Sequence, residues 1–227
     1  GLRQAEQIAL NNQGKLRLHL GETDEALACL EQAMAICEEI GDTRNRGFIL
    51  NNLGNLYRQL EDFDKAKAFL DQALAVRQAI DDRVGQGVTL ASLGQVERAL
   101  GKPAESLSRY RAAAVFLEPL GAVPEWIVCL SGEALAQLEA GNPDRALARA
   151  EDAVGLLGDS VVGDDIQEVH FNHFQVLSAC GQAGAAAKAL KRAVDEVNRR
   201  AGHVPEADRT AFLDAPLNQQ IVRAEAA

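Results

Sequence analysis

His170 and His173 are the residues whose types and spacing come nearest to a metal-binding pattern. They stand three positions apart on one face of an expected helix, and Asp164, Asp165 and Glu168 precede them. Histidine and carboxylate side chains are common ligands of zinc. An internal repeat, however, aligns His170 with leucines and His173 with other large residues. We therefore interpret both histidines as packing residues and expect no metal ion.

The sequence contains no motif for nucleophilic catalysis or for phosphate binding. There is no glycine-rich phosphate loop followed by Lys and Ser or Thr, and no Gly-x-Ser-x-Gly. The acidic pairs Glu38-Glu39 and Asp81-Asp82 fall in expected turns between helices, where acidic residues complement the dipole of a helix start. We predict no catalytic residue, no cofactor and no enzymatic activity. A hydrolase or phosphatase built on helical repeats is an alternative that no residue pattern supports.

The cysteines favour a reduced, cytoplasmic protein. Their number is small, and they fall inside helical patterns, as small buried thiols do: Cys29, Cys37, Cys129 and Cys180. Cys29 and Cys37 would lie roughly 12 Å apart on one helix, whereas the Cα atoms of a disulfide lie within about 7 Å. No apolar run is long enough to cross a membrane, and no signal peptide is visible, so we expect no membrane partner.

The overall charge and the first residue add two further expectations. A formal net charge of −10 argues against nucleic acid as a partner, because most of the surface would repel the phosphate backbone. The chain begins with Gly1 and its single methionine is Met34. We therefore expect it to be a piece of a longer polypeptide.

The strongest pattern is an internal repeat of 40 residues. Residues 10–36 align without gaps with residues 50–76, 90–116, 130–156 and 170–196. Glycine recurs in one column, with Glu61 as the exception, and small residues fill two others: Gly21, Gly101, Gly141, Gly181; Ala26, Ala66, Ser106, Ala146, Ala186; and Ala33, Ala73, Ala113, Ala153, Ala193. A fixed period of this length indicates stacked supersecondary units.

Each unit is expected to form two helices joined by a short turn. Apolar residues recur at helical spacing in the first half of the unit, and the small-residue columns occupy the second half. Glycine can end the first helix in a left-handed conformation, and Pro103 or Pro143 suits the first turn of the next helix. Small side chains then allow the two helix backbones to approach closely.

These columns resemble the tetratricopeptide repeat family. Gly54 matches the small residue of the family's first helix, and the other matched positions are Leu50, Leu53, Tyr57, Ala66, Leu70 and Ala73. The fourth and fifth units depart from the pattern with Ala134 and Phe174 in place of that glycine. The period of 40 is similar to the long-repeat branch of the family, which occurs in bacterial regulators, signalling ATPases and polarity scaffolds.

The resemblance implies an all-α fold, a right-handed α-α superhelix. Five helix pairs would span residues 1–201, at about 3–40, 43–80, 83–120, 123–157 and 163–200. The period stops after Gly202, and residues 202–227 would form a helical segment that caps the last apolar face.

In such a superhelix the first helix of each pair lines the concave face. The resemblance places these partner-binding candidates in the groove: Asn11, Lys15, His19, Phe48, Asn51, Asn55, Arg58, Gln59, Gln95 and Arg98. The amides can both donate and accept hydrogen bonds, which suits the backbone of a bound peptide. Lys15, Arg58 and Arg98 favour an acidic peptide or one with a free carboxylate.

We therefore predict a module that binds a peptide or partner domain, as the sensor or scaffold region of a larger bacterial regulatory or signalling protein. The alternative is self-association into a homo-oligomer. Apolar groove positions expected to be exposed motivate that alternative: Phe48, Val88, Leu138 and Phe171.

Overall fold

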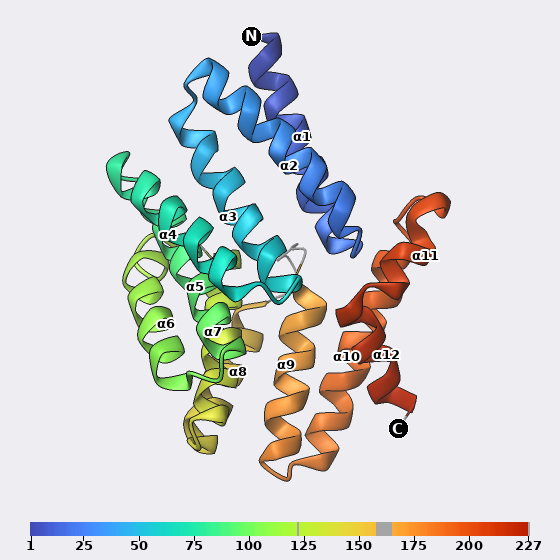
Figure 1. Ribbon diagram of the computed structural model, residues 1–227. Coiled ribbons are helices and arrows are strands. Elements are labelled where there is room, and N and C mark those ends of the chain that lie inside the picture. Colours follow the sequence, from blue (N-terminus) through green and yellow to red (C-terminus); the bar gives the residue numbers. More distant parts are fainter. Residues whose placement is uncertain (122, 158–164, 227) are drawn as a thin grey trace.

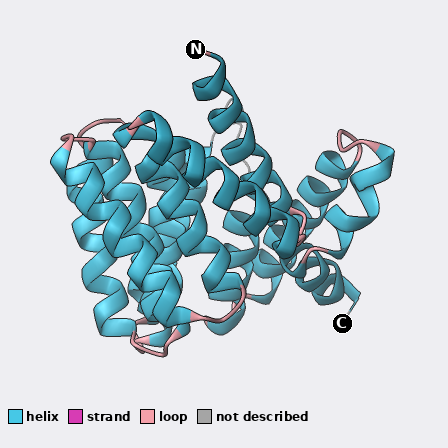
Figure 2. Ribbon diagram, turned by 45° about the horizontal axis from the view of Figure 1, so that its top comes forward, coloured by secondary structure: helices cyan, strands magenta, loops and turns pink. Residues whose placement is uncertain are grey.

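The computed structural model describes residues 1–121, 123–157 and 165–226, and within these ranges every regular element is a helix (Figure 1). The helices are, in chain order, α1 (Leu2–His19), α2 (Thr23–Ile40), α3 (Thr43–Gln59), α4 (Phe63–Ala79), α5 (Arg83–Ala99), α6 (Pro103–Leu117), α7 (Val123–Glu139), α8 (Pro143–Leu157), α9 (Ile166–Ala179), α10 (Ala183–Ala201), α11 (Glu206–Asp214) and α12 (Pro216–Ala226). Short turns join most of them (Figure 2). Among the described residues, no helix is both long and apolar enough to cross a membrane.

The helices from α1 to α10 pack as consecutive pairs, and the pairs stack on one another. Odd-numbered helices also touch in succession: α1 contacts α3, α3 contacts α5, α5 contacts α7, and α7 contacts α9. The odd helices therefore form a continuous inner layer, and the even helices cover it from outside (Figure 1). The prediction of an all-α solenoid of stacked helix pairs is confirmed.

Close approach within a pair explains the small residue of the first helix. A Cβ atom on Gly54 would lie 2.5 Å from Cγ of Leu70, and one on Gly14 would lie 2.7 Å from Cγ of Leu30. Because real Cβ atoms do not approach this closely, a larger residue would push the helices apart. Each leucine is fully buried in the space that its glycine leaves.

The fourth repeat keeps the same fit with different residues. Ala134 stands where Gly14 and Gly54 stand in the first two repeats, and Ala150 stands where they have leucine. Both alanines are buried in one core cluster. A larger residue on the first helix is thus matched by a smaller one on the second, so the departure from the family pattern leaves the packing intact.

Left-handed residues end the first helix of each repeat. Gly21 has φ 78° and Gly141 has φ 76°, while Glu61 adopts φ 59° at the equivalent position of the second repeat. Side chains other than glycine are strained in this region, typically by 1–2 kcal/mol. Glu61 therefore holds a conformation that the other repeats give to glycine.

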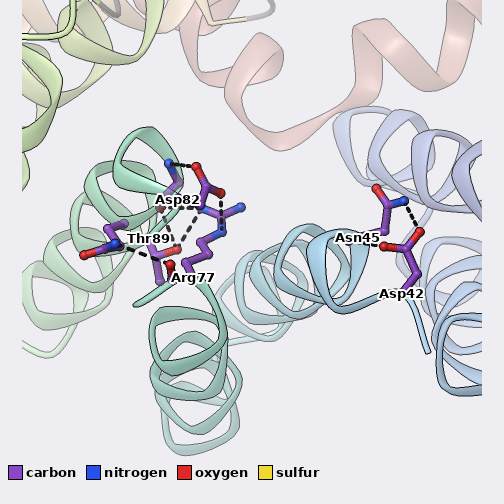
Figure 3. A network of polar contacts seen from close by, with 7 residues as sticks. Asp42, Asn45, Arg77, Asp82 and Thr89 are labelled. Atoms are coloured by element: carbon purple, nitrogen blue, oxygen red, sulfur yellow. Dashed lines mark hydrogen bonds and ion pairs between the residues drawn. The ribbon is translucent and has the colours of Figure 1, made fainter. Parts of the chain in front are cut away.

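Aspartates cap the helices that begin the second and third repeats. Asp42 Oδ1 accepts from the backbone N–H of Asn45 at 3.1 Å, and Asp82 Oδ1 accepts from that of Gly85 at 2.9 Å. Asp42 also accepts from the Asn45 side chain at 2.7 Å (Figure 3). These bonds satisfy N–H groups that have no partner inside the helix.

The last two helices form a hairpin on α10. Phe212 of α11 and Ile221 of α12 are buried in one apolar cluster with Val194 and Val197 of α10. The Asn218 side chain donates a 2.7 Å hydrogen bond to the Phe212 carbonyl, which fixes the turn between α11 and α12.

Candidate functional site

Three polar contacts between successive odd helices mark the inner face. The Asn52 amide of α3 donates to Asn11 Oδ1 of α1 at 2.9 Å. The Asn172 amide of α9 donates to Ser131 Oγ of α7 at 2.9 Å. Arg98 of α5 forms a 2.8 Å ion pair with Glu139 of α7. In each contact the two residues are 41 positions apart, because neighbouring repeats present the same helix face.

All ten residues predicted to bind a partner lie on α1, α3 and α5, but their accessibility differs. Lys15, Phe48 and Gln59 are exposed, and Asn51 is buried. The remaining candidates are half-buried: Asn11, His19, Asn55, Arg58, Gln95 and Arg98. The inner face therefore combines solvent-exposed candidates, which we call its rim, with buried polar ones, which we call its floor.

The floor of the inner face contains buried polar atoms that make no hydrogen bond with the described residues. On the inner helices they are Asn51 Oδ1, Asn55 Oδ1, Arg58 Nε and Arg98 Nε, and the fifth is the hydroxyl of Tyr110, a core residue of α6. Burial raises the pKa of Tyr110 above its usual value, and so its hydroxyl stays protonated. Unpaired buried polar groups are uncommon in folded proteins. Others occur on Gln7, Arg77, His170, His173 and Asn218, but four of the five atoms above belong to residues predicted to bind a partner.

The positive charge expected in the groove is partly neutralised. Arg98 is paired with Glu139, whereas Arg58 forms no ion pair with a described residue. Glu168 of α9 lies near both arginines. Burial raises the pKa of Glu168, as does Asp165, and the two arginines act in the opposite direction.

Arg77, at the end of α4, is a buried charge that the sequence analysis did not single out. It is 2 % exposed, and Nη1 donates to the Gly85 carbonyl and, at 2.9 Å, to Thr89 Oγ1 (Figure 3). Its Nε lies 3.9 Å from an Asp82 oxygen. Burial lowers the pKa of Arg77 to about 10, although Asp82 opposes this effect.

The alignment of the repeats contains a signal that singles out both Arg77 and Glu168. The residues equivalent to Arg77 are Cys37, Leu117, Leu157 and Val197, and those equivalent to Glu168 are Ile8, Phe48, Val88 and Val128. A charged residue in an otherwise apolar column must find polar partners or lose hydration. Comparison of the repeats alone would have identified both residues.

The histidines of α9 are half-buried side chains, and their Nδ1 atoms form no hydrogen bond with the described residues. Burial lowers the pKa of both His170 and His173. Among the residues that the structure describes, no group of three or more potential ligands could hold a metal ion. Asp164, which precedes these histidines in the sequence, lies outside the described residues.

The self-association alternative assumed that Phe171 is exposed, and this assumption was wrong. Phe171 is only 6 % exposed, because it packs in the apolar cluster of α9, α10 and the C-terminal hairpin. Its ring lies 5.6 Å from that of Phe174. Phe48 does remain accessible, with 44 % exposure.

The stacked helix pairs define a helical-repeat solenoid. Models of the tetratricopeptide repeat match residues 6–79, 46–118 and 127–152, so the chain belongs to the tetratricopeptide repeat family. Members of this family generally act as protein–protein interaction domains and are typically not catalytic. No curated protein matches the chain.

Solved structures share the fold at low sequence identity. BtubC (BKLC) from P. vanneervenii has 19 % identity and a TM-score of 0.66, over 90 % of this chain and 84 % of that chain. TTC0263, a thermophilic TPR protein from Thermus thermophilus, has 18 % identity and a TM-score of 0.64, over 97 % of this chain and 100 % of that chain. A Rap protein complexed with competence and sporulation factor has 14 % identity and a TM-score of 0.70, over 100 % of this chain but 64 % of that chain. Such identities show the fold alone.

Proposed function

We propose that the inner face of α1, α3 and α5 binds a peptide or partner domain, and that the chain is the sensor or scaffold region of a larger bacterial regulatory protein. The unpaired amide oxygens of Asn51 and Asn55 carry this proposal. A buried acceptor without a partner typically costs 1–3 kcal/mol. The backbone N–H groups of a bound peptide would supply the missing donors and remove that cost.

The charge of the floor favours an acidic peptide or one with a free carboxylate. Arg58 forms no ion pair with a described residue, and one of its nitrogen atoms is buried without a partner. A carboxylate can accept two parallel hydrogen bonds from a guanidinium group. Arg98 contributes less to this preference, because Glu139 already shares its charge.

Peptide recognition agrees with one structural neighbour, the Rap protein in complex with competence and sporulation factor. We infer binding rather than catalysis for this chain because the polar atoms of the floor are amides, guanidinium groups and a phenol that burial keeps protonated. None of these groups is an activated nucleophile at neutral pH.

A selection experiment tests the proposal while the partner is still unidentified. A random-peptide display library is selected on the wild-type chain, and the affinity of an enriched peptide is measured by fluorescence anisotropy. Asn51→Ala/Asn55→Ala should weaken binding by about tenfold or more, which corresponds to about 1.4 kcal/mol. The control Gln32→Ala/Gln72→Ala removes exposed amides from α2 and α4, on the outer layer, and should leave the affinity unchanged.

The same peptide with an amidated C-terminus tests the carboxylate preference. Arg58→Ala should weaken binding of the free-carboxylate peptide and have little effect on the amidated one. Equal affinity of the wild type and the Asn51→Ala/Asn55→Ala variant for every enriched peptide would refute binding at this face. Alanine is compatible with the fold at position 51, since Ala91 occupies the equivalent position of the third repeat.

Self-association is the second candidate, and the 44 % exposure of Phe48 on the inner face favours it. Light scattering after size exclusion should then give the mass of a dimer for the wild type and of a monomer for Phe48→Ser. A wild-type monomer at high concentration would eliminate this candidate.

A further inference from the structure

The first repeat and the C-terminal hairpin, at opposite ends of the chain, touch each other. A Cβ atom on Gly21, in the turn between α1 and α2, would lie 3.5 Å from Cδ of Pro216 and 3.8 Å from Cα of Ala215. In Figure 1 this turn, drawn in blue, reaches toward the red helices α11 and α12. We call the contact of Leu20 and Gly21 with Ala215 and Pro216 the closing contact.

Equivalent leucines of three repeats show what the closing contact buries. Leu20, Leu60 and Leu100 follow the first helix of the first, second and third repeats. Leu60 is 47 % exposed and Leu100 is 39 % exposed, but Leu20 is only 6 % exposed. Leu20 shares an apolar cluster with Phe212 and Ile221 of the C-terminal hairpin. The difference in exposure therefore comes from the hairpin and not from the repeat itself.

One charged residue of the hairpin lies near the first repeat. The pKa of Arg17 in α1 is raised by its ion pair with Glu22, and Asp208 of α11 adds to this effect. Because Arg17 is already paired with Glu22, the closing contact depends chiefly on apolar burial.

In this closed form, several polar atoms of the inner helices are buried. The oxygen atoms Asn51 Oδ1 and Asn55 Oδ1 are buried, as are Arg58 Nε and, in α6, the Tyr110 hydroxyl, and none of them has a hydrogen-bond partner among the described residues. A peptide cannot bond to atoms that it cannot reach. The odd helices of the inner layer must therefore move apart before these atoms can bind a ligand.

We propose that the closing contact is an autoinhibitory latch, which holds the solenoid in a closed form and must open for a peptide to enter the groove. This proposal rests on the proposed function. Opening costs free energy because it exposes Leu20 to water. It also recovers free energy because the buried polar atoms can then form hydrogen bonds with water, so the open and closed forms can be close in free energy. If about one tenth of the molecules are open, the apparent affinity for a groove ligand is reduced about tenfold.

The first arm of the test measures closure without any ligand. Leu20→Asp places a charge in the closing contact, and Leu60→Asp places the same charge at the equivalent, exposed position. Leu20→Asp should increase the radius of gyration in small-angle X-ray scattering and speed amide hydrogen exchange in residues 206–226, while Leu60→Asp should change neither. If Leu20→Asp leaves both measurements at their wild-type values, the latch does not exist.

The second arm locks the latch instead of breaking it, which avoids reliance on a destabilised variant. Gly21→Cys/Ala215→Cys is made with Cys29→Ala and Cys180→Ala to prevent mispairing. The Cβ atom of residue 21 would lie 3.8 Å from Cα of residue 215, a separation that a disulfide can span. A residue other than glycine is tolerated at position 21, since Glu61 adopts the same left-handed conformation in the second repeat. The oxidised protein should bind an enriched peptide at least about tenfold more slowly than the same protein after reduction.

The two arms separate the latch from the proposed function. Equal association rates of the oxidised and reduced forms, with binding intact, would overturn the latch and leave the binding face. If no peptide binds either form, the proposed function fails, and the scattering and exchange results alone decide whether the ends are held together.

Discussion

The guanidinium carbon of Arg77 lies 5.0 Å from the centroid of the Phe48 ring. The buried cation therefore packs against Phe48, the most exposed aromatic residue among the partner-binding candidates. Arg77 comes from α4 and Phe48 from α3, and the same guanidinium reaches the first turns of α5. One side chain thus connects the second repeat to the third. Its burial explains why its pKa falls to about 10.

Arg77→Met should preserve stability to within about 1 kcal/mol or increase it, because apolar replacement of a buried charge is often neutral or favourable. The Gly85 carbonyl would still accept the Thr89 hydroxyl at 3.0 Å. Arg77→Ala should lose roughly 2–4 kcal/mol, since it leaves a cavity. Urea unfolding of the three proteins measures both effects. A loss for methionine as large as that for alanine would mean that the guanidinium hydrogen bonds are needed.

Glu61→Gly should stabilise the protein by about 1 kcal/mol, since glycine adopts the left-handed region without the strain of a side chain. Glu61 has φ 59°, and the other repeats place glycine at this position. Gln72→Gly, in the exposed interior of α4, is the matched control and should destabilise by about 1 kcal/mol. Thermal unfolding that shifts in the same direction for both variants would contradict the strain at Glu61.

The fold class could be predicted because each column of the repeat alignment corresponds to one packing position between helices. Gly54 faces Leu70 across one helix pair, and each small residue marks a close approach between helices. The closing contact could not be predicted in this way. Leu20 and Leu60 are the same residue at the same repeat position, and only the curvature of the whole stack brings α11 and α12 to one of them.

The candidate binding face was predictable in its location but not in its accessibility. The family pattern placed Asn51 and Arg98 on the inner helices, where they lie. The burial of Asn51 and the pairing of Arg98 with Glu139 depend on how neighbouring odd helices approach each other. Which of these residues contact a partner stays a prediction until the peptide selection is done.

The cysteines should differ sharply in reactivity. Burial raises the pKa of Cys37 to about 11 and that of Cys129 to about 12, so both remain thiols at pH 8. Cys29 and Cys180 are half-buried and should react first with an alkylating reagent. Peptide mapping by mass spectrometry after a timed reaction identifies the modified residues. Modification of Cys129 as fast as of Cys29 in the folded protein would show that the core of α7 opens readily.

The same two thiols should make the fold sensitive to alkaline pH. Their folded pKa values lie above the ordinary value of 9.0, so the unfolded chain loses these protons first. Their contribution to stability is complete below about pH 9 and is lost as the pH rises towards 11 and 12. Cys129→Ala should reduce this alkaline loss, and urea unfolding between pH 8 and pH 10 measures it.

His170 and His173 should make the fold sensitive to acid. Burial lowers the pKa of both imidazoles, and Arg192 of α10 acts in the same direction, whereas Glu196 raises the pKa of His170 and Glu151 raises that of His173. Below the ordinary value of 6.5 the unfolded chain therefore binds protons that the folded chain does not. The free energy of unfolding should fall as the pH drops through 6.5 towards the lower folded values.

His170→Leu/His173→Leu should flatten this acid dependence, because leucine occupies both equivalent positions in the second repeat, as Leu50 and Leu53. The exposed His203, changed to glutamine, serves as the control and should leave the dependence unchanged. Urea unfolding at pH 7.5 and pH 5.0 gives the difference for each protein. If the double variant loses as much stability between these values as the wild type, the acid sensitivity arises elsewhere, and carboxylates such as Glu151 and Glu196 become the groups to replace next.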